Sequence, residues 1–299
     1  MFKSIVITGA SGFVGSNLKE YLKTSQEVFS MSVRFQPDQD FIFNGAAIIH
    51  LAGKAHDIKK VSQPQDYYEA NFELTKQLFD AFLKSEAKVF VFMSTVKAVA
   101  DEVKDILWEE KIPNPKTHYG IAKHQAEEYI LNKELPKGKR VYILRPCMIH
   151  GPGNKGNLNL LYQMVSNGLP WPLGAFENER SFLSIENLCF VVKELLENEA
   201  IPSGIYNVSD DAPLSTNELI QLLGESLGKP AKIVNLSPKV IRSIAKIGDV
   251  LPLTLNSERL QKLTESYVVS NQKIVNAIGK TLPISSVDGL RLTFKSFIK

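Results

Sequence analysis

A glycine pattern directly after the first apolar run constrains the fold of this chain more than any other feature. The run 5–7 (Ile-Val-Ile) is followed by Gly9, Gly12 and Gly15, and a helical pattern begins among these glycines. Without a Cβ atom, Gly9 permits a tight turn, Gly12 lets the backbone approach a pyrophosphate, and Gly15 lets helix and strand pack closely. An anion then lies at the helix N-terminus, where free N–H groups favour negative charge. The sequence therefore predicts a dinucleotide-binding turn, with expected cofactor contacts at Gly9, Ser11, Gly12, Phe13 and Val14.

The first half of the chain alternates short β-branched runs with helical patterns. Such alternation favours an α/β fold, a doubly wound parallel sheet with helices on both faces. Strands are expected at Ser4–Thr8, Glu27–Val33, Ala47–Leu51, Lys88–Met93 and Val141–Leu144, with helices near Gly12–Thr24, Asp66–Ser85 and Tyr119–Leu131. The loop-like segment 151–154 then separates the expected nucleotide-binding domain, 1–150, from a smaller C-terminal lobe, 151–299. In that lobe, helices are expected near Leu158–Asn167, Asn187–Asn198, Ser215–Leu227, Pro238–Val250 and Asn271–Gly279.

Composition argues against several classes of protein. The 299 residues carry a net charge of only +3, from 35 basic and 32 acidic residues, which does not favour nucleic-acid binding. Cys147 and Cys189 show no metal-ligand spacing, so we expect buried free thiols in a reducing compartment and no metal site. Neither a signal peptide nor a membrane-spanning run is recognised, so a cytoplasmic protein without stable membrane insertion is expected. Pro238–Val250 has the pattern of a basic amphipathic helix, for which packing within the lobe is favoured over contact with a membrane surface.

The second expected strand ends without the acidic residue that usually accepts hydrogen bonds from an NAD ribose. Val33 stands near that position and Arg34 follows it. A guanidinium suits a ribose 2′-phosphate, so Arg34 favours NADP over NAD, and both stay open. The strand that contains His50, interpreted as a structural histidine, runs into small residues that would let the backbone lie against the cofactor ribose. The expected contacts there are Leu51, Ala52 and Gly53.

Three polar residues farther along form the expected reaction centre. Tyr119 and Lys123 are spaced i, i+4 and therefore project from one helical face. A phenol with its ordinary pKa of about 10 is a poor base at neutral pH, and a nearby ammonium lowers that pKa. Tyr119 could then move a proton to or from a sugar hydroxyl while hydride moves to or from a nicotinamide, whose ribose Lys123 could hold. Thr95 follows the strand over 88–93, and its hydroxyl could bind the substrate oxygen, a role that Ser94 could share.

Seven motifs occur in the order typical of one enzyme family. They are T-G-A-S-G-F-V-G, I-I-H-L-A-G, Y-Y-E-A-N, F-M-S-T, Y-G-I-A-K, L-R-P and R-S-F-L-S-I-E-N-L. In these motifs the chain resembles the extended short-chain dehydrogenases/reductases, specifically the NAD(P)-dependent nucleotide-sugar epimerases, dehydratases and 4-ketoreductases. The resemblance implies a Rossmann-type fold, a homodimer, a UDP-sugar site in the C-terminal lobe, and a segment near 181–198 that returns to the nucleotide-binding domain. It also implies that Asn71 lies near the cofactor and that Asn157 and Arg180 contact the nucleoside diphosphate, for which a guanidinium is a strong bidentate partner.

Departures from the family pattern narrow the expected activity. Val96 and Lys97 stand where sugar 4,6-dehydratases carry the Asp and Glu that act in water elimination, so dehydration is not expected. The stretch M-S-T-V-K-A-V-A-D-E is similar to bacterial reductases of UDP-4-keto-6-deoxy-N-acetylhexosamines in polysaccharide synthesis, and Arg34 also favours a reductase. A UDP-hexose 4-epimerase uses the same constellation and stays open, and a non-catalytic NAD(P)-sensing protein is a remoter alternative. Only 15 residues separate Arg34 from His50, where the family normally fits another strand and helix, so we expect a shortened sheet edge and an open adenine pocket.

Overall fold

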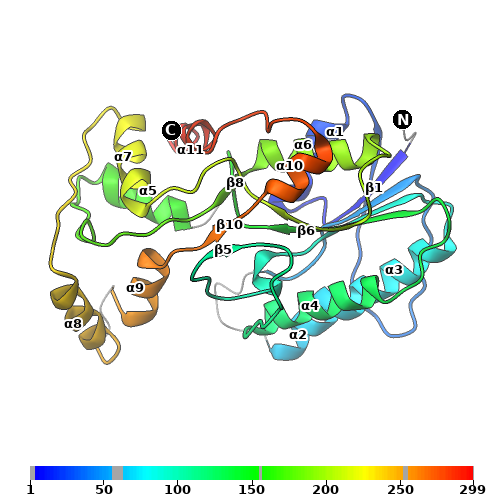
Figure 1. The fold of residues 1–299 in the computed structure, drawn as a ribbon, viewed down its shortest axis with the longest axis horizontal. Helices are drawn as coiled ribbons and strands as arrows, with labels where there is room; N and C mark the ends of the chain where they lie inside the picture. Colours follow the sequence, from blue (N-terminus) through cyan, green and yellow to red (C-terminus); the bar gives the residue numbers. More distant parts are fainter. Residues whose placement is uncertain (1–3, 56–62, 155–156, 252–254, 299) are drawn as a thin grey trace.

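A six-stranded parallel sheet forms the centre of the computed structural model, which describes residues 4–55, 63–154, 157–251 and 255–298 (Figure 1). The strands stand in the order β2-β1-β3-β4-β6-β9. Their bounds are β1 (Ser4–Thr8), β2 (Glu27–Met31), β3 (Ala47–His50), β4 (Val89–Met93), β6 (Arg140–Pro146) and β9 (Gly204–Val208). Alternate side chains enter two different cores, since Ile5 and Ile7 pack on one face and Val6 on the other. Burial of both faces explains why the central strands β1, β3 and β4 are nearly continuous apolar runs.

Helices cover both faces of the sheet. On one face lie α1 (Phe13–Leu22), α6 (Ile185–Glu197) and α10 (Gln272–Ile278), which are drawn above the sheet in Figure 1. On the other face lie α2 (Pro64–Tyr68), a π-helical turn (Glu69–Glu73), α3 (Leu74–Lys84) and α4 (His118–Leu131). The doubly wound α/β fold predicted from the sequence is therefore confirmed.

The second half of the chain supplies part of this sheet and its cover. Strand β9 pairs in parallel with β6, from Tyr142 opposite Gly204 to Pro146 opposite Val208. Helix α6 contacts α1 on the same face of the sheet. The sequence predicted no strand over 204–208, and this strand is an addition to the fold expected from the sequence. The division into 1–150 and 151–299 stays a prediction.

The remaining helices enclose a third core at the other end of the molecule, to the left in Figure 1. They are α5 (Asn157–Ser166), α7 (Thr216–Ser226), α8 (Pro238–Gly248), α9 (Ser257–Thr264) and α11 (Ser286–Lys295). Two short parallel pairs also form, β5 (Ile106–Leu107) with β10 (Val268–Val269) and β7 (Met148–His150) with β8 (Phe182–Ser184). Helices α9 and α11 were not predicted. No helix in the described ranges combines the length and the apolar character needed to cross a membrane.

Strand β2 forms one edge of the sheet, because the segment 32–46 contains neither strand nor helix. Two aromatic side chains of that segment, Phe41 and Phe43, pack into the core beside Ile48 and Phe79. The shortened edge expected from the small spacing between Arg34 and His50 is thus present. The open adenine pocket stays a prediction.

Candidate active site

The turn between β1 and α1 leaves no room for side chains at two of its three glycines. Gly9 has a φ of +68°, and a Cβ atom there would lie 2.7 Å from the backbone nitrogen of Ala52. A Cβ at Gly15 would lie 2.3 Å from the carbonyl oxygen of Gly9. At Gly12 the same carbonyl would be 3.3 Å away, and no other neighbour would be within 4 Å. The fold therefore requires Gly9 and Gly15, whereas Gly12 keeps one face of the turn open.

The start of α1 is also open on this face. Gly12 is the N-cap residue and provides no side-chain hydrogen bond to the first turn of the helix. Ser11 and Gly12 are exposed, and Phe13 and Val14 are half-buried beside them. N–H groups at a helix start without a side-chain cap suit an anion such as a pyrophosphate.

Behind the turn, His50 holds the end of β3 in place. Its Nδ1 is 2.8 Å from the Thr8 hydroxyl and its Nε2 is 2.9 Å from the Thr75 hydroxyl. Burial, together with the nearby charge of Lys123, lowers the pKa of His50 well below its ordinary value. The Thr8 hydroxyl also accepts a hydrogen bond from the Ala52 nitrogen at 3.2 Å. His50 is thus a structural histidine, as predicted, and it positions the segment 51–53.

A π-helical turn brings Asn71 to the same place. The helix predicted over Asp66–Ser85 is wrong in this detail, because the turn Glu69–Glu73 interrupts it. Asn71 is fully buried, and its side chain accepts from the Lys54 nitrogen at 3.1 Å and donates to the Lys54 carbonyl at 3.0 Å. A Cβ on Gly53 would lie 2.6 Å from Asn71 Oδ1, so the two residues are in direct contact. π-Helical turns often occur at functional sites, and only the family motif, not local periodicity, pointed to Asn71.

Thr95, Tyr119 and Lys123 meet at the carboxyl end of β4, as predicted. Thr95 follows this strand and caps the short 3-10 helix Val96–Ala98, while Tyr119 and Lys123 lie one turn apart on α4. The Lys123 ammonium donates to the Met93 carbonyl at 2.8 Å, and the Thr95 side chain hydrogen-bonds the Tyr119 phenol. Lys123 Nζ would also be 3.3 Å from a Cβ on Gly53, so the reaction centre adjoins the expected cofactor site.

The electrostatics of this centre correct one expectation. Burial raises the pKa of Tyr119 to about 12, and the hydrogen bond with Thr95 only partly opposes this shift. Burial lowers the pKa of Lys123 to about 7, against the raising effect of Glu127. The sequence predicted that Lys123 would lower the pKa of Tyr119, but desolvation dominates at both residues. Tyr119 therefore keeps its proton at neutral pH, whereas Lys123 gains and loses one there.

A buried ion pair between Glu127 and Arg145, which the sequence did not reveal, lies next to this centre, one helical turn beyond Lys123. The Arg145 guanidinium donates to the Glu127 carboxylate, from Nη2 at 2.6 Å and from Nε to the two oxygens at 3.0 and 3.1 Å. Burial alone would raise the pKa of Glu127, but hydrogen bonds from His124 and Arg145 outweigh it and lower the pKa. The buried Ser94 hydroxyl donates to the same carboxylate, which does not favour its predicted contact with substrate. The i+4 spacing that joins Tyr119 to Lys123 also places Glu127 on the same face of α4, but it does not reveal the pairing with Arg145.

Arg34 lies where β2 approaches the glycine turn. Strands β1 and β2 are parallel and end together, with Thr8 opposite Met31. Arg34 follows three residues beyond that point and is exposed. The position is compatible with a contact to the adenosine end of a cofactor, and the preference for NADP stays a prediction.

Arg180 lies between the C-terminal lobe and the reaction centre. Its backbone forms a bridge to Tyr267, whose hydroxyl donates to the Ala100 carbonyl at 2.7 Å, just after the turn that begins at Thr95. The Arg180 guanidinium donates to the Lys262 carbonyl and lies 3.9 Å from the Glu265 carboxylate. Diphosphate binding by Arg180 stays a prediction. Asn157 begins α5, but its side chain lies outside the part of the chain that the structure describes.

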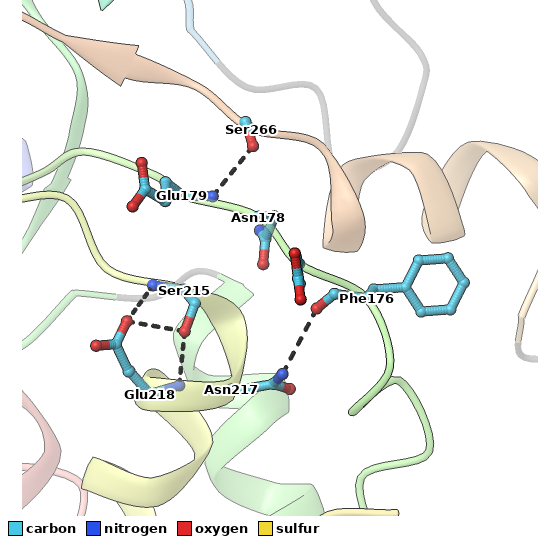
Figure 2. A pocket seen from close by; sticks show the side chains of 8 residues that line it. Phe176, Asn178, Glu179, Ser215, Asn217, Glu218 and Ser266 are labelled. Atoms are coloured by element: carbon cyan, nitrogen blue, oxygen red, sulfur yellow. Dashed lines mark hydrogen bonds between the residues drawn. The ribbon is translucent and has the colours of Figure 1, made fainter. Parts of the chain in front are cut away.

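A pocket in the C-terminal lobe is separate from the predicted site residues (Figure 2). It is lined by Phe176, Glu177, Asn178, Glu179, Ser215, Asn217, Glu218 and Ser266. The Glu218 carboxylate is already occupied, since it accepts hydrogen bonds from the nitrogen and hydroxyl of Ser215 at the start of α7. The Glu179 nitrogen likewise donates to the Ser266 hydroxyl. None of the residues predicted to act in catalysis or binding lines this pocket, although its lining residue Glu179 directly precedes Arg180 in the chain.

The chain is similar to a family model, to characterised proteins and to solved structures. Residues 5–209 match the model of the NAD dependent epimerase/dehydratase family. The chain is 27% identical to a UDP-glucose 4-epimerase of Vibrio cholerae, over 100% of this chain and 97% of that protein. It is 25% identical to a GDP-6-deoxy-D-mannose reductase of Pseudomonas aeruginosa, over 75% of this chain and 80% of that protein. The structure of a UDP-glucuronic acid 4-epimerase from Bacillus cereus in complex with NAD has a fold similar to this one, with a TM-score of 0.74, 20% identity and 98% of each chain covered.

The matched region contains the glycine turn, the π-helical turn and the Thr95, Tyr119 and Lys123 centre, and it ends just beyond β9. It covers well over half of the chain, and the two sequence relatives described above are a UDP-sugar epimerase and a GDP-sugar reductase. The chain therefore belongs to the NAD dependent epimerase/dehydratase family of enzymes, within the extended short-chain dehydrogenases/reductases that its motifs indicate.

Proposed function

We propose that this enzyme reduces the C4 ketone of a UDP-linked hexose with NADPH or NADH. The leading candidate substrate is a UDP-4-keto-6-deoxy-N-acetylhexosamine of bacterial polysaccharide biosynthesis. The observation that supports the proposal is the arrangement of Tyr119 beside Thr95, with Lys123 next to Gly53 of the expected cofactor site. Burial raises the pKa of Tyr119 to about 12. A phenol that holds its proton at neutral pH can donate it to a ketone oxygen that is becoming an alkoxide.

Each side chain of the centre has a separate part in this proposal. Tyr119 donates its proton to the C4 oxygen, and the Thr95 hydroxyl hydrogen-bonds the same oxygen and orients it. The bound nicotinamide supplies the hydride. Lys123 lies one turn from Tyr119 and has a pKa of about 7, so it can return a proton toward the phenol after each turnover. One hydride and one proton together convert the ketone to the alcohol.

The surrounding residues hold the two ligands in this proposal. Arg34 pairs with a ribose 2′-phosphate and selects NADPH, and Arg180 and Asn157 bind the diphosphate of the sugar nucleotide. The cofactor itself is contacted by Gly9, Ser11, Gly12, Phe13, Val14, Leu51, Ala52, Gly53, Asn71, Tyr119 and Lys123. We also propose that the enzyme is a cytoplasmic homodimer.

A UDP-hexose 4-epimerase is the second candidate. The Vibrio cholerae relative, which matches this chain over its whole length, is a 4-epimerase. An epimerase oxidises C4 before it reduces the opposite face, so Tyr119 would also have to accept a proton. The preference for a reductase therefore rests on Arg34 and on the stretch M-S-T-V-K-A-V-A-D-E.

Two measurements test the proposal. Purified enzyme is incubated with NADPH and a UDP-4-keto-6-deoxy-N-acetylhexosamine, and oxidation of NADPH is followed together with the product by mass spectrometry. We expect stoichiometric consumption of both compounds. Inversion of a UDP-hexose without added cofactor would instead assign the epimerase, as would tightly bound NAD released on denaturation.

Tyr119→Phe tests the role of the phenol. Loss of a general acid lowers turnover by about 10²- to 10⁴-fold, while binding of NADPH is retained. Tyr129→Phe on the same helix is the matched control. The Tyr129 hydroxyl donates to Asp80 at 2.7 Å and is not among the hydrogen bonds of the predicted reaction centre. If Tyr119→Phe turns over substrate as fast as Tyr129→Phe, the proposal is wrong.

A further inference from the structure

Residues 234–251 contain the densest run of exposed large hydrophobic side chains in the described part of the chain. Val240, Ile244, Ile247 and Leu251 follow one another at intervals of four, three and four residues, which places them on one side of α8 and its extension. We call these four residues the α8 stripe, and each is at least 40% exposed. Val234, Leu236 and Val250 add further exposed apolar surface next to it.

A different face of α8 already packs on the lobe. Ile241 and Ala245 are 2% and 1% exposed and belong to the third core. A Cβ on Gly248 would lie only 1.9 Å from the Leu255 carbonyl oxygen, so the helix contacts the following segment closely. Packing of α8 within the lobe, which the sequence favoured, is confirmed for this face. The helix cannot rotate to bury the α8 stripe without withdrawing these residues from the core.

The exposed polar residues of α8 are all basic or neutral. Lys239, Arg242 and Lys246 are exposed, and the helix contains no acidic residue. Asp249 follows directly, but its carboxylate accepts hydrogen bonds from the nitrogen and hydroxyl of Ser257. The helix lies at the outer end of the lobe, away from the central sheet (Figure 1). Lys239 and Lys246 each neighbour a stripe residue and lie about 100° from it around the helix, whereas Arg242 lies opposite the stripe, over the Phe176 ring. An apolar stripe with lysines along one border has the chemistry of an interfacial helix.

We propose that α8 docks this enzyme on the surface of a bilayer that contains anionic lipids. The α8 stripe enters the boundary between headgroups and acyl chains, and Lys239 and Lys246 reach the lipid phosphates from its border. The cations favour a lipid surface over an apolar groove of another protein, because a bilayer satisfies both the apolar and the basic residues along the whole helix. Docking of this kind is peripheral and requires no helix that spans the membrane.

The position of α8 connects this surface to the candidate active site. Helix α9 packs against α8, and the Lys262 carbonyl at its end accepts a hydrogen bond from Arg180. Helix α9 therefore links α8 to Arg180 through direct contacts. The docking proposal itself does not depend on which reaction the enzyme catalyses.

Sedimentation with vesicles tests the proposal on the full chain. We expect the enzyme to pellet with vesicles of phosphatidylcholine and phosphatidylglycerol, to stay in the supernatant with phosphatidylcholine alone, and to be released by salt. The double variant Ile244→Glu/Ile247→Glu should lower the bound fraction about tenfold or more, as should Lys239→Glu/Lys246→Glu. Leu292→Glu, an equally exposed leucine on α11, is the control and should bind like the unaltered enzyme.

Because all these positions are exposed, the variants should keep the NADPH affinity and the unfolding temperature of the unaltered enzyme. The proposal is overturned if the unaltered enzyme binds neither kind of vesicle, or binds both equally. It is also overturned if Ile244→Glu/Ile247→Glu converts a dimer to a monomer in light scattering, since a second copy of the chain would then be the partner of the stripe.

Discussion

Two glycines of the turn after β1 serve different purposes, although the sequence motif gives them equal weight. In Gly15→Ala the new Cβ would lie 2.3 Å from the Gly9 carbonyl oxygen, so the backbone must move and we expect a loss of about 1–3 kcal/mol in the free energy of unfolding. In Gly12→Ala the same contact is 3.3 Å, so we expect a nearly normal free energy of unfolding but NADPH affinity at least roughly tenfold lower. Thermal unfolding and calorimetric titration with NADPH check the two outcomes. Unchanged NADPH affinity in Gly12→Ala would mean that the pyrophosphate binds elsewhere.

Lys123 makes the stability of the enzyme depend on pH. Its pKa is about 7 in the folded chain and near the ordinary 10.5 in the unfolded chain. Between these values the unfolded chain binds more protons, so the free energy of unfolding increases with pH, by at most about 1.4 kcal/mol per pH unit for one proton. Lys123→Met removes this group, and we expect its free energy of unfolding to rise less steeply from pH 7 to pH 9. Urea unfolding of both proteins at several pH values gives the slopes, and equal slopes would show that Lys123 is not the group responsible.

The predicted site residues that the structure brings together are those whose chemistry is tied to a local pattern. Thr95, Tyr119 and Lys123 could be found because a helical spacing and a strand end fix where they point. Glu127 and Arg145 were missed because their contact joins α4 to β6, and nothing local shows that these elements lie side by side. The raised pKa of Tyr119 was missed for the same reason, since it arises from burial in the tertiary structure.

The π-helical turn between α2 and α3 places Asn71 where it can hydrogen-bond neighbouring backbone groups. Asn71 in this turn hydrogen-bonds both backbone groups of Lys54 and the Tyr67 carbonyl. Asn71→Ala leaves these buried groups without partners, and we expect a loss of about 1–3 kcal/mol in the free energy of unfolding together with weaker NADPH binding. Asn114→Ala, at an exposed position, is the control and should change the free energy of unfolding by less than about 0.5 kcal/mol. Urea unfolding measures both, and equal values would argue that the turn does not stabilise the site.

Among the elements, the buried strands were predictable and β9 was not. Strands β1, β3 and β4 are apolar runs because both faces of the sheet are covered. In β9 the polar Asn207 interrupts such a run, yet it is fully buried. Its side chain donates to the Leu107 carbonyl at 3.1 Å and its backbone nitrogen to the Glu109 carboxylate at 2.9 Å. The partners that make this residue acceptable in a core strand lie about a hundred residues away along the chain, where local reasoning does not reach.

At the scale of the whole molecule, α6 and β9 from the second half of the chain complete the sheet that the first half begins. This arrangement determines which fragments can fold alone. The side chains of Leu188, Val191 and Leu195 from α6 are fully buried in the same core as Ile5 and Ile7 from β1. A fragment of residues 1–150 would expose that core and leave β6, which is buried along most of its length, without its neighbour β9. We therefore expect no cooperative unfolding transition and no NADPH binding from this fragment.

A longer fragment, 1–209, separates the effect of losing β9 and α6 from the effect of losing the rest of the C-terminal lobe. It regains β9 and α6 and lacks α10 and the β10 segment from that core, so we expect it to recover a cooperative transition with a lower unfolding temperature than the full chain. Circular dichroism during heating and titration with NADPH compare the two fragments. Cooperative unfolding of 1–150 would show that the nucleotide-binding domain is independent with the bounds that the sequence suggested. If only 1–209 unfolds cooperatively, the folding unit is defined by the sheet rather than by the change in composition after residue 150.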